Sequence, residues 1–367
     1  METVFPFGFP AATAGYLALY VLTFALHQFF MHYVLAGTLY IGWCSLFPGN
    51  GTPRGEQPLA ALIREWLPLL LSAAITAGVA PLLFVQIVYP TQFYTANLLL
   101  SWKWMIVVPL LIVAFYLLYL LKSKIFTRWP LAARAAITVA TAASFVFIGF
   151  CWTVNHLLGN NTAAWPDVYS SGQLNLNTVE ILARMFIWIG GSFASLSVFT
   201  AWQLHRKESL PGHEVSRMAS MGMGGTVLSV CSALVYLWLI GAESRGVLIG
   251  ALGLPYLLAG LAGATMQLFG WWKVLASKSI TIKWLISVST GLLLSLLGVS
   301  VARETLRLQS LDLTSLFARH TEASEIGGLT VFVLFAAVNG LLIAFCIWLV
   351  IPMNRQQNNE KAEVTAN

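Results

Sequence analysis

Three of the six histidines lie inside long apolar stretches, where an ionisable side chain is costly and therefore marks a candidate site. His27 and His32 fall in the first apolar stretch, and His156 falls near the end of the fourth. Imidazole is the side chain best able to ligate haem iron within a membrane. We therefore take His27 as a candidate ligand of haem iron and His156 as a candidate cofactor contact. The alternative for each is a histidine that is hydrogen-bonded to a neighbouring helix.

The spacing of the first two histidines decides whether they can share a cofactor. His27 and His32 are five residues apart, which is about 140° around a helix of 3.6 residues per turn. They therefore cannot face one site, and at most one of them joins a given cofactor. The other three histidines fall in predicted loops: His205, His213 and His320.

Four further polar residues are candidates for holding a cofactor. Arg184 and Arg303 share one predicted side of the membrane, where a guanidinium group can pair with haem propionates or with acidic loops. Gln86 and Tyr94 follow the proline-containing run 78–81 and could line a quinone or haem pocket. The alternatives are arginines that snorkel to lipid phosphate and a proline that serves packing alone.

Carboxylates are expected to be missing from the middle of every apolar stretch. Of the 14 acidic residues, Glu180, Glu243 and Glu304 fall at predicted helix ends, and the others fall in predicted loops or tails. This distribution disfavours an ion-coupled transporter or a proton pump, which place Asp or Glu near the bilayer midplane. The four cysteines form no C-x-x-C pair, which excludes the usual zinc, iron–sulfur and covalent haem motifs.

The composition requires a membrane to hold these residues. Of 367 residues, 58% are hydrophobic and only 9% are charged, and the mean hydropathy is +0.77. Stretches of about 20 apolar residues cross a bilayer as helices. The sequence therefore predicts an all-α, polytopic membrane bundle with about nine spans: 12–47, 67–90, 97–121, 135–158, 178–203, 218–241, 247–275, 284–302 and 328–352.

The basic residues predict the orientation of the bundle. Met1 to Ala11 has no basic residue, so the first apolar stretch is not a cleavable signal peptide and should remain as a span. With the N-terminus outside and the C-terminus in the cytoplasm, fourteen of the 20 basic residues lie on the cytoplasmic side, as the positive-inside rule requires. The six others lie outside or at outer helix ends: Lys103, Arg184, Arg245, Arg303, Arg307 and Arg319. Because the basic residues form no single patch, lipid rather than nucleic acid is the expected partner.

The domain organisation is simple. We expect one transmembrane domain over 1–352 and a disordered cytoplasmic tail over 353–367, with the longest loops at about 158–177 and 303–327. Small residues recur at 221–225 and 260–264, where helix backbones should approach one another closely.

Several short motifs share their order with a known family. The first stretch reads Leu22-Thr-Phe-Ala-Leu-His27 and continues to Gly37, and the second contains Gly78-Val-Ala80 followed by aromatic and polar residues to Tyr94. The sixth ends with Val227-Leu-Ser-Val and is followed by Gly241-Ala-Glu-Ser244. With nine spans and an external N-terminus, these motifs resemble subunit I of the cytochrome bd quinol oxidase superfamily. The resemblance implies that His27 matches that family's haem ligand in the opening helix.

The sequence also departs from that family's pattern. The run Arg184-Met-Phe-Ile-Trp188 has no histidine where the family's fifth span carries a second haem ligand. The third span lacks acidic residues, the eighth lacks an embedded glutamate, and the segment after Glu243 is short where the oxidases have a long quinol loop. Oxygen reduction consumes protons, and this pattern offers no carboxylate route for them. The chain is therefore not expected to be a complete terminal oxidase.

The function expected from these observations is electron transfer rather than bond-breaking catalysis. The resemblance implies a cytochrome bd-like subunit of a respiratory complex in the bacterial cytoplasmic membrane, which binds one haem b and meets quinone or a partner cytochrome. The expected partners are other membrane or cytochrome subunits. Two alternatives remain: a cofactor-free scaffold subunit with the same fold, and a permease for a neutral solute.

Overall fold

The chain is all-α in the computed structural model, which describes residues 8–47, 57–174, 176–205, 211–309, 311–327, 330–342, 344, 345 and 348. Within these ranges there is no strand. The predicted tail 353–367 lies outside the described residues. The helices of eight or more residues in these ranges are α1 (Ala11–Leu46), α2 (Pro58–Val88), α3 (Pro90–Leu100), α5 (Val107–Lys122), α6 (Leu131–Asn160), α8 (Thr178–His205), α9 (Gly212–Leu239), α10 (Ala242–Ile249), α11 (Leu254–Ser277), α12 (Ile282–Gln309), α13 (Leu313–Glu325) and the unlabelled helix Thr330–Leu342. Shorter helices are α4 (Trp102–Met105) and α7 (Trp165–Ser171).

The lengths and composition of these helices are those of a membrane bundle. Among the described residues, seven helices are long and apolar enough to span a bilayer, with Trp102–Lys122 counted as one, and two bent helix pairs raise the number to nine if each pair is one span. One pair is α10 with α11, bent by 75°, and the other is α13 with Thr330–Leu342, bent by 64°. The predicted helical class and the predicted apolar helices are confirmed to this extent.

Two breaks in the helices have local causes. Pro90 begins α3 and has no N–H to continue α2, so the helix ends at Val88 and Tyr89 takes an extended φ of −127°. Ser101 has a φ of +54°, which separates α3 from α4 inside the predicted span 97–121. The first break places Tyr89 at the end of the bundle that carries the polar residues described below.

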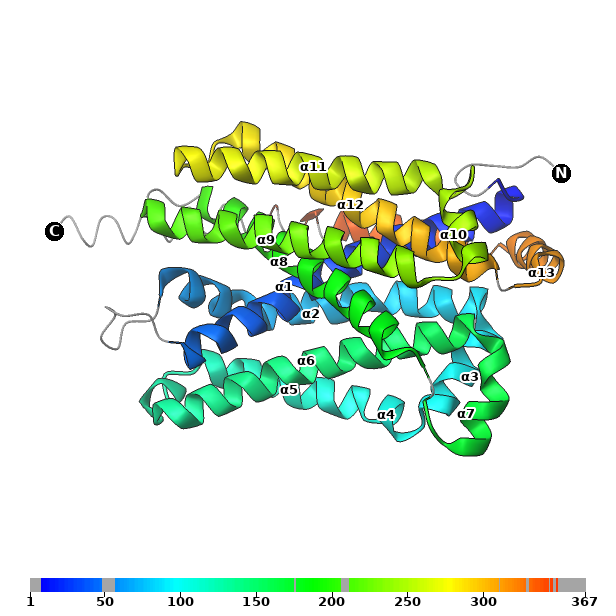
Figure 1. The fold of residues 1–367 in the computed structure, drawn as a ribbon, viewed down its shortest axis with the longest axis horizontal. Coiled ribbons are helices and arrows are strands. Elements are labelled where there is room, and N and C mark those ends of the chain that lie inside the picture. The colour runs from blue at the N-terminus through cyan, green and yellow to red at the C-terminus, as the bar shows by residue number, and fades with distance from the viewer. Residues whose placement is uncertain are drawn as a thin grey trace. The chain divides into compact units, whose positions relative to one another are not determined.

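The chain divides into two compact units. One comprises 1–16 and 312–367, and the other comprises 17–311. In the second unit the long helices run side by side, with α3, α7 and α10 at one end of the bundle (right in Figure 1). We call this end the α8-start end, because α8 begins there and α6, α9 and α12 end there. In the first unit, His320 on α13 contacts Thr13 and Tyr16.

Several segments that were expected to be loops are helical, and those predictions are wrong. α12 continues to Gln309, seven residues beyond the predicted span, and α7 and α13 lie within the segments 158–177 and 303–327. His205 is the last residue of α8, His213 lies in α9 and His320 in α13. The apolar stretch marks only the part of a helix that meets lipid, so helices that continue beyond it were missed.

Glycines allow close crossings between helices, as the small-residue runs predicted. A Cβ on Gly225 would lie 2.6 Å from the carbonyl oxygen of Gly190, where α9 crosses α8. A Cβ on Gly263 would lie 2.4 Å from the carbonyl oxygen of Gly291, where α11 crosses α12. Both contacts are with backbone, so only glycine fits at this separation.

Candidate functional site

His27 is held at the contact between α1 and α2. Its Nδ1 lies 2.9 Å from the carbonyl oxygen of Ala74, and its ring packs against Gly78, where a Cβ would lie 2.9 Å from the ring. A carbonyl oxygen can only accept, so Nδ1 carries the proton and Nε2 keeps its lone pair. Histidines that ligate metals usually donate their other ring N–H in this way. The half-buried His27 ring is therefore in the tautomer that a haem ligand needs.

His32 faces a different helix. Its Nδ1 lies 2.9 Å from the Ser195 hydroxyl on α8, and that hydroxyl donates to the carbonyl oxygen of Gly191 at 2.9 Å. The single hydroxyl proton of Ser195 is thereby used, so the Nδ1 of His32 donates to Ser195. His27 bonds to α2 and His32 bonds to α8, which confirms the prediction that they face different sites.

His156 is in the opposite tautomer to His27, with the proton on Nε2 rather than on Nδ1. Arg184 Nη2 lies 2.8 Å from His156 Nδ1, and a guanidinium group can only donate. Nδ1 therefore accepts and Nε2 carries the proton. His156 Nε2 and Arg184 Nη1 are both buried and have no hydrogen-bond partner among the described residues. Together they offer N–H donors to a ligand that carries a carbonyl or carboxylate oxygen, and in this arrangement His156 cannot ligate iron.

Arg303 belongs to a buried charged cluster at the α8-start end. The Tyr89 hydroxyl donates to Glu304 Oε2 at 2.8 Å, and Arg303 Nη1 lies 3.5 Å from Glu304 Oε1. Arg307 lies over the Tyr89 ring at 4.0 Å, and Arg303 lies over the Phe24 ring at 4.5 Å. Glu304 is fully buried. We call Tyr89, Arg303, Glu304 and Arg307 the α12 charge cluster.

The α12 charge cluster and the His156–Arg184 pair form one electropositive region. Arg184 donates to His156 on α6, and a Cβ on Gly159, in the next turn of α6, would lie 3.9 Å from Arg307 Nη2. The region therefore contains three buried or nearly buried guanidinium groups. Among the described residues of this region, Glu304 is the one fully buried carboxylate. Excess buried positive charge is costly unless an anion or other acceptor compensates it. Three of the predicted site residues, His156, Arg184 and Arg303, are thus brought together.

A cavity of about 500 Å³ opens beside Arg184. It is lined by residues from α6, α8, α9, α10 and α12, of which the polar ones are Asn160, Asn161, Asn177, Glu180, Arg184, Tyr236, Glu243, Ser244 and Gln309. Arg184 lies 5.3 Å from the centre of the Tyr236 ring, so a charged and an aromatic group share one wall. The Oδ1 of Asn160 is buried without a partner in the described part of the chain. The wall therefore presents both a donor and an acceptor.

Gln86 and Tyr94 lie apart from this cavity. The Tyr94 hydroxyl donates to Gln86 Oε1 at 3.3 Å across the break between α2 and α3, and half of the Tyr94 side chain is exposed. Neither residue lines the cavity, and neither does His27. The predicted site residues therefore fall into three places: His27 between α1 and α2, the Gln86–Tyr94 pair, and the electropositive region of His156, Arg184 and Arg303. Of these last three residues, Arg184 lines the cavity and the other two do not.

The sequence did not predict the roles of Tyr89, Glu304 and Arg307. Glu304 and Arg307 follow the predicted span 284–302, and they were placed at an outer helix end because α12 was expected to stop before them. The spacing Arg303-Glu-x-x-Arg307 puts Glu304 and Arg307 three residues apart, on one helix face. That spacing was the available signal, but it becomes informative only once the helix is known to continue.

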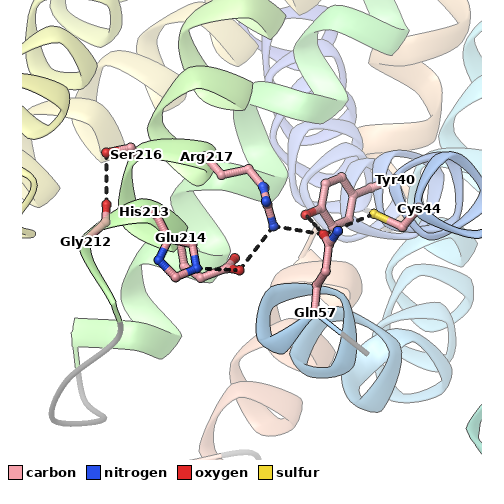
Figure 2. A network of polar contacts seen from close by, with 8 residues as sticks. All are labelled: Tyr40, Cys44, Gln57, Gly212, His213, Glu214, Ser216 and Arg217. Atoms are coloured by element: carbon pink, nitrogen blue, oxygen red, sulfur yellow. Dashed lines mark hydrogen bonds and ion pairs between the residues drawn. The ribbon is translucent and has the colours of Figure 1, made fainter. Parts of the chain in front are cut away.

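A second polar cluster lies at the opposite end of the bundle, where α9 begins. Figure 2 shows that Gln57 Oε1 accepts hydrogen bonds from Arg217, Tyr40 and Cys44, at 2.8, 3.4 and 3.5 Å. Arg217 also donates to the buried Glu214 at 3.1 Å. The prediction that every acid outside the three helix-end glutamates lies in a loop or tail is wrong for Glu214, because it lies in the first turn of α9.

No family model matches this sequence, and no curated protein matches it significantly. In the described ranges, no group of three or more His, Cys, Asp or Glu side chains is placed to hold a metal ion.

Proposed function

We propose that this chain is a cytochrome bd-like membrane subunit of a respiratory electron-transfer assembly, which holds one haem b through His27 and meets quinone or a partner cytochrome. The proposal places it in a bacterial cytoplasmic membrane with the N-terminus outside. The tautomer of His27 is the observation that carries it. A haem supplies one-electron transfer, and the chain's part is to bind and orient the haem and to exclude water from it.

The residues around His27 fit a haem ligand. The Ala74 carbonyl fixes the tautomer, the absent side chain of Gly78 makes room for the ring, and Nε2 is left as a lone-pair donor to iron. His27 and Gly78 come from the two motifs that carry the family resemblance, and they meet in space. Their contact gives the resemblance a physical reason, because a side chain at position 78 would displace the imidazole.

The electropositive region fits acceptor groups of a cofactor. Arg184 and His156 present N–H donors, and Arg303 has only a 3.5 Å contact with Glu304 Oε1 for its Nη1. Carboxylate oxygens of a propionate or carbonyl oxygens of a quinone headgroup would satisfy such donors. We assign the quinone to the cavity beside Arg184, because a cavity of about 500 Å³ with hydrogen-bonding groups on its wall has room for a small ring headgroup.

The haem assignment is tested by a reduced-minus-oxidised spectrum of the purified protein. Wild type is expected to show Soret and α bands, and His27→Ala is expected to lose both. Gly78→Ala should lower the haem content several-fold, because its Cβ would lie 2.9 Å from the His27 ring. Gly42→Ala is the matched control on α1, since a Cβ there meets nothing within 4 Å.

A cofactor-free scaffold is the alternative that the same hydrogen bond favours. The bond from His27 to the Ala74 carbonyl also fastens α1 to α2 without any cofactor. Wild-type protein that is purified at normal yield without haem would support this alternative and contradict the haem proposal. In that case His27→Ala should still lower the thermal stability, because a helix contact is lost.

The permease alternative is the weaker one. Its sites usually lie at the midplane between broken helices. The bend between α10 and α11 could suggest such a helix. However, α11 has 24 residues, which is about 36 Å and enough to cross a bilayer alone. Gly241, Glu243 and Ser244 line the cavity at the α8-start end, so the bend belongs to that end of the bundle.

A further inference from the structure

The turn between α11 and α12 carries three lysines. Lys273 lies near the end of α11, Lys278 lies in the turn, and Lys283 is the second residue of α12. A Cβ on Gly212, which begins α9, would lie 3.5 Å from the Cβ of Lys278. The turn therefore lies at the end of the bundle where α9 begins, opposite to the α8-start end.

Three aromatic rings from the two helices meet beside these lysines. The centre of the Phe269 ring lies 5.8 Å from that of Trp272 on α11 and 5.5 Å from that of Trp284 on α12. Lys273 Nζ lies 4.6 Å from the centre of the Trp272 ring and 5.3 Å from that of Phe269. Lys283 Nζ lies 5.0 Å from the centre of the Trp284 ring. We call these two lysines and three rings the lysine–aromatic cluster.

The rings hold two positive charges on one joined surface, because an ammonium group is attracted to the face of an aromatic ring. Neither Lys273 nor Lys283 has a carboxylate partner among the described residues. The sequence contains no Asp or Glu between Glu243 and Glu304, so neither helix offers one nearby. Each ammonium group has three N–H donors, and those that point away from the ring can bind the oxygen atoms of an anion.

The surface around the cluster is apolar and exposed. Phe269 and Trp272 are each about half exposed, and so are Ile282 and Ile286 on α12. In a membrane bundle such side chains contact acyl chains, and tryptophan near a helix end lies at the level of the lipid headgroups. A ligand that fits this surface therefore has an anionic group next to an apolar part.

We propose that the lysine–aromatic cluster binds an anionic phospholipid, whose phosphate contacts Lys273 and Lys283 and whose acyl chains lie along the exposed side chains of α12. Anionic headgroups attract basic side chains near the membrane surface. A soluble anion would match the ammonium groups but not the apolar rings. A zwitterionic lipid would bring its own cation beside two ammonium groups, which repel it.

The fixed position of the two lysines distinguishes this site from general anchoring. A lysine that snorkels to the headgroups needs no particular lipid. Here the two lysines come from different helices and are held on rings that contact one another. The composition predicted lipid in general as a partner, whereas the cluster indicates one class of lipid and one place for it. The inference depends on neither haem nor quinone, so a negative haem spectrum would leave it standing.

The test is lipid binding to the full-length protein in detergent, measured by native mass spectrometry. The probes are a phosphatidylglycerol and a phosphatidylcholine with the same acyl chains, titrated separately. Wild type should bind its first phosphatidylglycerol about tenfold or more tightly than its first phosphatidylcholine. The variant Lys273→Gln/Lys283→Gln should lose this preference, with phosphatidylcholine binding unchanged. Lys273→Arg/Lys283→Arg should keep the preference, because it retains both charges.

Lys103→Gln/Lys122→Gln is the matched control, because it removes two lysine charges from outside the cluster. Lys103 Nζ lies 5.1 Å from the centre of the Trp102 ring, so it also forms a lysine–tryptophan pair. Lys122 is the last residue of α5. Phosphatidylglycerol should bind this variant as tightly as it binds wild type.

Four outcomes would overturn the proposal. Wild type could bind the two lipids equally, or Lys273→Gln/Lys283→Gln could keep the preference. The control variant could lose as much affinity as the cluster variant, which would mean that basic residues attract lipid wherever they lie. Inorganic phosphate could displace the phosphatidylglycerol, which would mean that the surface holds a free anion rather than a lipid.

Discussion

At the scale of single residues, the partner of one ring nitrogen decides what each histidine can do. His27 donates to a carbonyl and keeps Nε2 as a ligand, whereas His156 accepts from Arg184 and keeps only a donor. The sequence predicted His27 as a candidate iron ligand and His156 as a candidate cofactor contact, because each is an imidazole within an apolar stretch. The structure adds that His156 can serve a cofactor only as a hydrogen-bond donor. Spacing alone gave the separation of His27 from His32, but no sequence pattern gives a tautomer.

Removing the buried carboxylate of the α12 charge cluster should be costly. Glu304→Leu leaves Arg303 and Arg307 beside Tyr89 without that carboxylate, so we expect a loss of about 3–5 kcal/mol in the free energy of unfolding. Tyr89→Phe removes only the hydroxyl that donates to Glu304, which should cost about 1 kcal/mol. Thermal unfolding of the two variants in detergent measures the difference. Equal melting temperatures for Glu304→Leu and wild type would contradict the buried pairing.

The residues of this cluster show why part of the site could not be predicted. Arg303 was recognised because arginines near an apolar stretch are conspicuous, and it does lie with Arg184 and His156. Tyr89 follows the same proline-containing run as Gln86 and Tyr94, and nothing in that run points to a contact with residues beyond position 300. Its burial depends on Pro90, which ends α2 and leaves Tyr89 at the break, where its hydroxyl bonds to α12, more than 200 positions away in sequence. Contacts of that kind are tertiary and leave no local pattern.

At the scale of helices, the glycines of α11 offer a direct comparison. Gly263→Ala would bring a Cβ within 2.4 Å of the Gly291 carbonyl oxygen, so α11 and α12 must separate. We expect this overpacking to cost about 1–3 kcal/mol.

Gly260→Ala is the control, one turn away on the same helix, because its Cβ meets nothing within 4 Å. Alanine also has a higher helix propensity than glycine, so this variant should be as stable as wild type or slightly more stable. Thermal unfolding of the purified variants checks both expectations. Equal melting temperatures for Gly263→Ala and Gly260→Ala would show that the helices do not approach so closely.

Helix existence was predictable, but helix ends were less so. Long apolar stretches gave all the long helices of residues 17–311, because a bilayer allows few other structures. The break at Ser101 and the bend between α10 and α11 were not predicted, since the surrounding residues remain apolar. Hydropathy indicates whether a helix is surrounded by lipid or by water. It does not indicate these interruptions, because they are set by backbone geometry.

At the scale of the whole molecule, the orientation in the membrane is open to a labelling test. Lys124 follows α5, and Ser170 lies in α7 between α6 and α8, so the two positions should be on opposite sides. In a variant without the natural cysteines, Ser170→Cys should react with an impermeant maleimide in intact cells. Lys124→Cys should react only after the membrane is opened, because basic connections stay in the cytoplasm. Labelling in the opposite order would reverse the proposed topology.

Side chains at intervals of four residues on α1 bear on how the bundle is assembled: Gln28, His32, Ala36 and Tyr40 form a buried row on this helix. Four residues turn a helix by about 400°, so each successive member is rotated by about 40° and the row winds around α1. Gln28 therefore meets α12, His32 meets α8, and Tyr40 meets Gln57 at the start of α2. One helix thus sets the axial register of three neighbours at once. An insertion or deletion of one residue within α1 would turn one half against the other by about 100°, so a generic apolar anchor could not replace it.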